Sequence, residues 1–62
     1  MIHLKDLIAV LDVDTHITIT ATINYKEIYD GFPRDFNEKS YELFHVKAVW
    51  FSKIHNSLMI EL

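Results

Sequence analysis

The feature that most constrains the fold is residues 17–23, where apolar side chains alternate strictly with threonine. Successive side chains of a β-strand point to opposite faces, so this alternation predicts a strand with two unlike faces. The residues expected to face a core are Ile17, Ile19, Ala21 and Ile23. The opposite face would carry the β-branched polar residues Thr18, Thr20 and Thr22. We therefore expect a sheet with one face on a core and the other open to a different contact.

A length of 62 residues leaves room for one small domain, residues 1–62. A domain this short buries only about 60% of the surface that its unfolded chain exposes. Since 50% of the residues are apolar, part of the apolar surface is expected to meet a partner protein or a second copy of the chain. The absence of cysteine excludes disulfides and thiolate zinc sites and fits a cytoplasmic protein.

Charge and hydropathy argue against membranes and nucleic acids as partners. No run of about 18 apolar residues is present, and the first residues lack the pattern of a signal peptide, so we expect no membrane association. Nucleic-acid binding draws on clustered Lys and Arg. The formal charge of −3 and the scattered positions of the six basic residues argue against it.

Apolar spacing and turn signals predict six elements. One helical face is outlined by the apolar residues Leu4, Leu7, Ile8 and Leu11. Asp35 and Glu38 have the spacing of a capping box ahead of a second helix. A loose turn is expected at residues 24–26, Gly31 would mark a bulge or a strand end, and Asn56 suits a tight turn. The predicted elements are a helix over 3–12, strands over 16–24 and 27–32, a helix over 36–44, and strands over 46–53 and 58–62.

These elements predict an α+β fold of order α-β-β-α-β-β, most simply an antiparallel sheet of about four strands with both helices on one face. The strand order beyond the two hairpins stays open. The predicted core consists of Leu4, Leu7, Ile8, Leu11, Ile17, Ile19, Ile23, Ile28, Leu43, Val49, Phe51, Leu58 and Ile60.

Asp12, Asp14 and His16 form a D-x-D-x-H pattern of the kind that can hold a hard cation. A calcium loop starting at Asp12 would need glycine at its sixth position and an acidic residue at its twelfth. Isoleucine occupies both positions, Ile17 and Ile23. The segment is therefore expected to be a solvated loop in which the aspartates end the helix and start the strand.

The other polar residues do not predict an active site. The four histidines form no H-x-x-H or H-x-x-x-H pair, and each lies near an expected element boundary. The serines lack a nucleophile elbow, and a single glycine excludes a glycine-rich phosphate loop. We therefore expect a non-enzymatic protein with no catalytic residues, no metal site, no cofactor and no small-molecule substrate.

The aromatic residues are the strongest indication of function. If Val49 and Phe51 face the core, Trp50 faces outward together with Ala48, whereas the opposite alternation would place Trp50 inward. In the first arrangement the open face carries the predicted partner-binding residues Trp50, Tyr29, Met59, Thr18, Thr20 and Thr22. Trp, Tyr and Met are enriched at protein interfaces. Since strand 46–53 has large apolar residues on both faces in either arrangement, a second copy or a different protein is expected to cover one of them.

Two alternative functions stay open. Aromatic side chains on an open sheet can stack unpaired bases when basic residues lie beside them. Lys47 and Lys53 would fall on the face of Val49 and Phe51, which leaves single-stranded nucleic-acid binding as one alternative. A structural homodimer subunit is the other.

Four segments carry a family resemblance: Leu4-Lys5-Asp6-Leu7, Ile17-Thr18-Ile19, Ile28-Tyr29-Asp30-Gly31 and the ending His55-Asn56-Ser57-Leu58-Met59-Ile60-Glu61-Leu62. Over most of its length the chain thereby resembles a loose group of short proteins encoded by phages and mobile elements of Gram-positive bacteria. The resemblance implies an accessory protein in the cytoplasm of a bacterial host, and it implies no shared site residue. Some small acidic phage products block host proteins, including CRISPR and other defence effectors. The expected function is that of a small phage-type inhibitor or modulator of a host protein.

Overall fold

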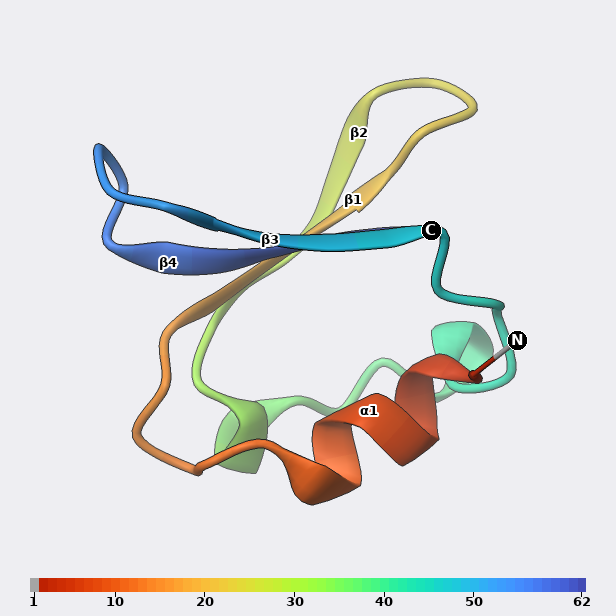
Figure 1. Ribbon diagram of the computed structural model, residues 1–62. Coiled ribbons are helices and arrows are strands. Elements are labelled where there is room, and N and C mark those ends of the chain that lie inside the picture. Colours follow the sequence, from red (N-terminus) through yellow and green to blue (C-terminus); the bar gives the residue numbers. More distant parts are fainter. Residues whose placement is uncertain (1) are drawn as a thin grey trace.

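The computed structural model describes residues 2–62, which form two layers, a four-stranded sheet and a layer with one α-helix. The elements are α1 (Leu4–Val10), β1 (Ile17–Ala21), β2 (Lys26–Gly31), the 3₁₀ turns η1 (Pro33–Asp35) and η2 (Lys39–Tyr41), β3 (Ala48–Ser52) and β4 (Ser57–Glu61). In Figure 1, α1 and the segment between β2 and β3 lie on the same side of the sheet. The predicted α+β class is confirmed, and α1 is shorter than the predicted helix.

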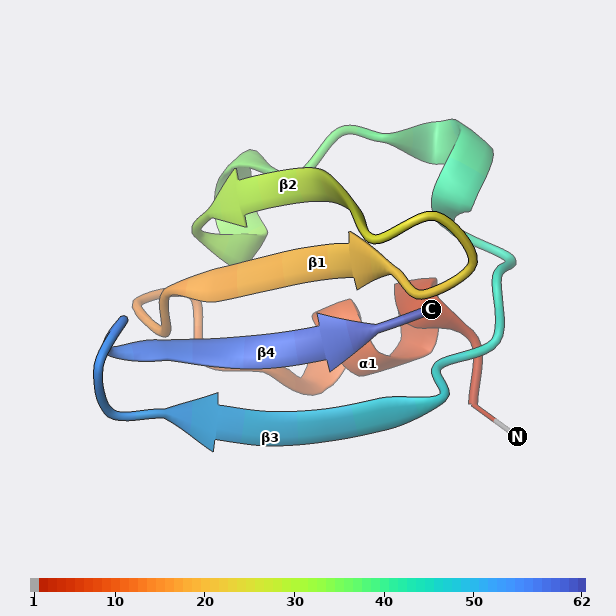
Figure 2. The same ribbon diagram turned by 90° about the horizontal axis from the view of Figure 1, so that it is seen from above.

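The two hairpins lie side by side in the strand order β2-β1-β4-β3 (Figure 2). Each hairpin is antiparallel, but β1 and β4 are parallel neighbours in the centre. The predicted antiparallel sheet is therefore wrong. The connection formed by residues 32–47 carries the chain from the β2 edge to the opposite edge, so that β4 rather than β3 reaches β1. This order puts the two strands with buried isoleucines in the centre of the sheet.

The predicted helix over 36–44 is also wrong, because this segment forms no α-helix and only the η1 and η2 turns flank or enter it. Its backbone has another partner. The carbonyls of Glu42 and Phe44 accept hydrogen bonds of 2.9 Å from the N–H groups of Lys5 and Leu4. Those N–H groups belong to the first turn of α1, which has no side-chain cap. The connection thus caps α1 with its carbonyls instead of forming a second helix.

The core lies between α1 and the inner faces of β1 and β4. Its buried apolar residues are Leu4, Ile17, Ile19, Val46, Ile60 and Leu62. The half-buried residues that pack against them are Leu7, Ile8, Leu11, Ile28, Tyr29, Phe36, Tyr41 and Leu58. Four residues of the predicted core are instead exposed, namely Ile23, Leu43, Val49 and Phe51.

Each of these four exposures has a physical reason. β1 ends at Ala21, so Ile23 falls in the hairpin turn and is 89% exposed. Leu43 lacks the helix that would have turned it inward. The register does place Val49 and Phe51 on the inner face, but α1 lies beneath β1 and β4 and does not extend under β3 (Figure 2).

The turn signals of the sequence are confirmed. Asn56 adopts a positive φ of 49° between β3 and β4, and Tyr25 one of 55° between β1 and β2. Gly31 is the last residue of β2. In the loop after α1, the Asp12 carboxylate accepts a 3.0 Å hydrogen bond from the Asp14 N–H, which stabilises the turn there.

The difference between Ile19 and Ile23 is directly testable, because the same substitution can be made at both. Ile19→Val removes a methylene from a fully buried side chain and is expected to lower the free energy of unfolding by about 1 kcal/mol. Ile23→Val changes an exposed turn residue and should stay within about 0.5 kcal/mol of the wild type. Urea denaturation followed by circular dichroism measures both, and equal losses would contradict the position of Ile23.

Candidate functional site

The face of the sheet that points away from α1 carries most of the predicted site residues, and we call it the outer face. One row of paired residues crosses β2, β1, β4 and β3 as Asp30, Thr18, Met59 and Trp50. The next row crosses the same strands as Glu27, Thr20, Glu61 and Ala48. Trp50 thus lies outward, which is one of the two alternations that the sequence left open.

Tyr29 is the exception, and its predicted place on the open face is wrong. The pairing of β1 with β2 shifts by one residue between Ile19 and Thr20, which places Tyr29 opposite the core residue Ile19. The Tyr29 ring packs edge-on against Phe36 with centroids 5.2 Å apart, and its hydroxyl donates a 2.7 Å hydrogen bond to the Phe32 carbonyl. This β-bulge therefore moves Tyr29 to the inner face and leaves the acidic residues of β2 on the outer face.

Thr22 lies one residue beyond β1 and still belongs to this surface. Its hydroxyl donates a 2.7 Å hydrogen bond to the Leu62 carbonyl and accepts one of 3.1 Å from the Lys47 ammonium. Thr22 therefore ties the end of β1 to the residues just outside β3 and β4, and it brings one cation to this end of the surface.

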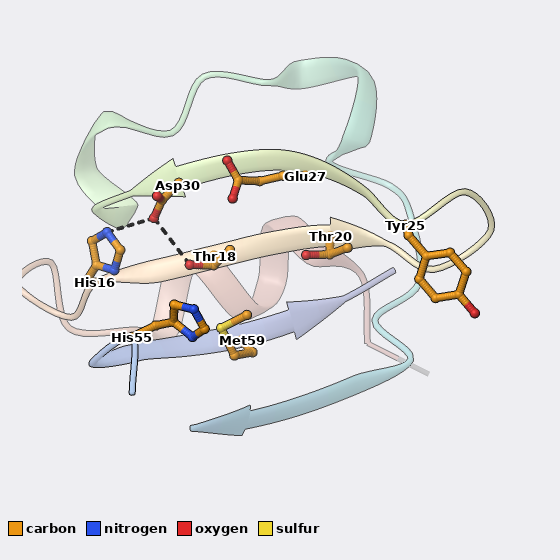
Figure 3. Close-up of a pocket in the computed structure, with 8 residues that line it drawn as sticks. All are labelled: His16, Thr18, Thr20, Tyr25, Glu27, Asp30, His55 and Met59. Atoms are coloured by element: carbon orange, nitrogen blue, oxygen red, sulfur yellow. Dashed lines mark hydrogen bonds and ion pairs between the residues drawn. The ribbon is translucent and has the colours of Figure 1, made fainter. Parts of the chain in front are cut away.

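Two adjoining hollows are formed on the outer face. The first has a volume of about 360 Å³ and is lined by His16, Thr18, Thr20, Tyr25, Glu27, Asp30, His55 and Met59 (Figure 3). The second has a volume of about 210 Å³ and is lined by Thr20, Thr22, Tyr25, Trp50, Met59 and Glu61. Because Thr20, Tyr25 and Met59 line both, the hollows form one groove. Its first part is polar and acidic, whereas its second part is dominated by the Trp50 and Met59 side chains.

A chain of hydrogen bonds stabilises the polar end of the groove. The His16 ring contacts the Asp30 carboxylate through Nε2 at 2.8 Å, and the Thr18 hydroxyl donates to the same oxygen at 3.3 Å. The Thr18 and Ser57 hydroxyls are 2.9 Å apart, and Ser57 donates to the His16 carbonyl at 3.2 Å. The His16 ring therefore bonds to a carboxylate and does not contact the Ser57 hydroxyl, which is fully buried. This arrangement joins three strands.

Trp50 is held at the apolar end of the groove. Its indole Nε1–H donates a hydrogen bond to the Glu61 carboxylate, from β3 to the neighbouring β4. The side chain nevertheless stays 49% exposed. An indole that is oriented by a hydrogen bond and still open to solvent loses little side-chain entropy when a partner covers it.

Sequence reasoning missed the residues that give the groove its charge and its rim, namely His16, Tyr25, Glu27, Asp30 and His55. The row of threonines points to two of them, because Glu27 and Asp30 pair with Thr20 and Thr18. Without knowledge of the bulge, however, simple alternation cannot place both acidic residues on one face, because Asp30 is the third residue after Glu27.

The absence of a metal site stays a prediction. Among residues 2–62, no group of three His, Cys, Asp or Glu side chains is arranged to hold a metal ion. Within the same residues, no helix is long and apolar enough to cross a membrane. Comparison with protein-family models, with curated proteins and with solved structures finds no match to this chain.

Thr18 and Thr20 allow a test of the hydrogen-bond chain. Thr18→Val removes a hydroxyl that contacts both Ser57 and Asp30 and should lower the free energy of unfolding by about 1–2 kcal/mol. Thr20→Val alters a partly buried neighbour on the same face and is expected to change the free energy of unfolding by less than about 0.5 kcal/mol. Urea denaturation compares the two variants, and a loss no larger for Thr18→Val would contradict the role assigned to the chain.

The changed position of Tyr29 predicts a pH dependence. Partial burial and the Asp35 carboxylate raise the pKa of Tyr29 above its ordinary value of 10.0. Above this pH the unfolded phenol ionises before the folded one, so the contribution of Tyr29 to stability declines until its native-state pKa is passed. Tyr29→Phe should therefore show a shallower loss of stability between pH 9 and about 11. Tyr25→Phe keeps Tyr29 and should retain the wild-type decline, so identical profiles for both variants would contradict the shift.

Proposed function

We propose that this protein is a non-enzymatic interaction module that binds another protein through the outer face of its sheet. The observation that carries the proposal is the pairing of half-exposed Trp50 with Met59 above a groove of two joined hollows. Trp and Met are enriched in the cores of protein interfaces, where a few aromatic anchors supply most of the binding energy. The groove supplies a concave surface beside this anchor.

The charge of the outer face favours a protein over a nucleic acid as the partner. Glu27, Asp30 and Glu61 line the groove, whereas Lys47 is the one lysine bonded to a groove residue among residues 2–62. A phosphate backbone would be repelled by these carboxylates. The resemblance to short phage accessory proteins favours a host protein in the bacterial cytoplasm as the partner, and inhibition or modulation of that protein as the consequence.

The direct test compares Trp50→Ala with Phe44→Ala. The two side chains are 49% and 48% exposed, but Phe44 lies in the connection between β2 and β3, where its carbonyl caps α1. A protein captured from bacterial lysate by the wild-type chain is purified, and its affinity for each variant is measured by calorimetry. Trp50→Ala should raise the dissociation constant at least about tenfold, and Phe44→Ala should leave it within about twofold.

Circular dichroism controls for folding in this comparison, since truncation of an exposed Trp50 should leave the fold intact. An unchanged affinity for Trp50→Ala, or a larger loss for Phe44→Ala, would refute binding through the outer face. A stable dimer in light scattering that Trp50→Ala dissociates would show that the outer face pairs with a second copy instead.

A further inference from the structure

β3 is the open edge of the sheet. Within residues 2–62 it pairs with β4 on one side and with no strand on the other. Figure 2 shows no chain beyond β3, whereas the connection with η1 and η2 runs along the β2 side. An uncovered edge strand offers unpaired backbone donors and acceptors to an incoming strand.

The hydrogen bonds of β4 show which backbone groups of β3 are free. The N–H groups of Leu58 and Leu62 bond to β1, through the His16 and Thr20 carbonyls at 2.8 and 2.9 Å. Since backbone groups of alternate residues point to opposite sides of a strand, the groups of Ser57, Met59 and Glu61 point toward β3.

All five residues of β3 lie opposite residues of β4, but only alternate residues direct their backbone N–H and C=O groups toward it. Trp50 and Ser52 lie opposite Met59 and Ser57 and exchange backbone hydrogen bonds with them. Val49 and Phe51, which alternate with them, direct their N–H and C=O groups to the open edge.

Three side chains of β3 are also exposed. Val49, Trp50 and Phe51 are 44%, 49% and 54% exposed, although they alternate between the two faces. A strand added at this edge would place its own side chains beside all three, which is how neighbouring strands stabilise each other.

The charges at the ends of β3 indicate what kind of strand can pair with this edge. Lys47 and Lys53 bracket the strand, both are exposed, and neither forms an ion pair within residues 2–62. A second copy that paired along the whole of β3 would place Lys47 opposite Lys53 twice, which is unfavourable. A segment with an acidic residue at each end would instead place opposite charges across from both lysines.

We infer that β3 accepts an extended segment of the partner protein as a fifth strand, with apolar residues beside Val49 and Phe51 and an acidic residue at each end. The inference rests on the proposed function, because it adds strand pairing at the edge next to Trp50. Main-chain hydrogen bonds would supply affinity, and the two lysines would supply selectivity.

The test uses two seven-residue peptides with blocked ends, Asp-Thr-Val-Thr-Val-Thr-Asp and Lys-Thr-Val-Thr-Val-Thr-Lys. Each is titrated into the ¹⁵N-labelled chain, and amide shifts and hydrogen exchange are followed by NMR. The Asp-ended peptide should slow exchange of the Val49 and Phe51 amides at least about fivefold at saturation and bind about fivefold more tightly than the Lys-ended one. The double variant Lys47→Glu/Lys53→Glu should reverse that preference.

Val49→Pro removes one outward N–H while keeping the pairing of β3 with β4. It should lower the affinity for the Asp-ended peptide at least about threefold relative to Val49→Ala. Equal affinity for both peptides, no change at the Val49 and Phe51 amides, or a dimer formed through β3 without peptide would each overturn the inference. Shifts confined to Thr20, Tyr25 and Met59 would also overturn it, while leaving binding at the outer face intact.

Discussion

The parallel pairing of β1 with β4 is the interaction on which the rest of this structure depends. It brings Ile17, Ile19 and Ile60 together above Leu4, and all four side chains are fully buried. An α-helix about 10 Å wide covers roughly two strands spaced about 4.8 Å apart. A single helix can therefore cover the central pair of strands but not both edges. The half-exposed side chains of β3 follow from this geometry.

The connection between β2 and β3 follows from the same pairing. Parallel neighbours cannot be joined by a tight turn, so the chain must pass from one edge of the sheet to the other. On this path its carbonyls cap the first turn of α1, through Glu42 and Phe44. These capping contacts hold the first turn of α1 against the connection.

The two ends of the outer face differ in character. At its polar end, His16, Asp30, Thr18 and Ser57 stabilise the sheet by hydrogen bonds between strands, which uses the side chains that would otherwise suggest catalysis. At its other end, Trp50 is oriented by Glu61 and stays half exposed. The proposed interaction combines this anchor with the open edge of β3. In a domain this small, residues that cannot be buried inside are available for binding outside.

The sequence by itself determined the elements whose signals are local: helix α1, the two-faced strand β1, and the turns at residues 24–26 and at Asn56. It also pointed to Trp50, Met59 and the threonines as binding residues, but alternation left the face of Trp50 open. Only the tertiary structure decided the parallel pairing, the bulge that turns Tyr29 inward, and the exposure of Val49 and Phe51. The physical reason is that periodicity and turn propensity depend on neighbouring residues. Strand partners, register shifts and the reach of α1 depend on contacts between residues far apart in the chain.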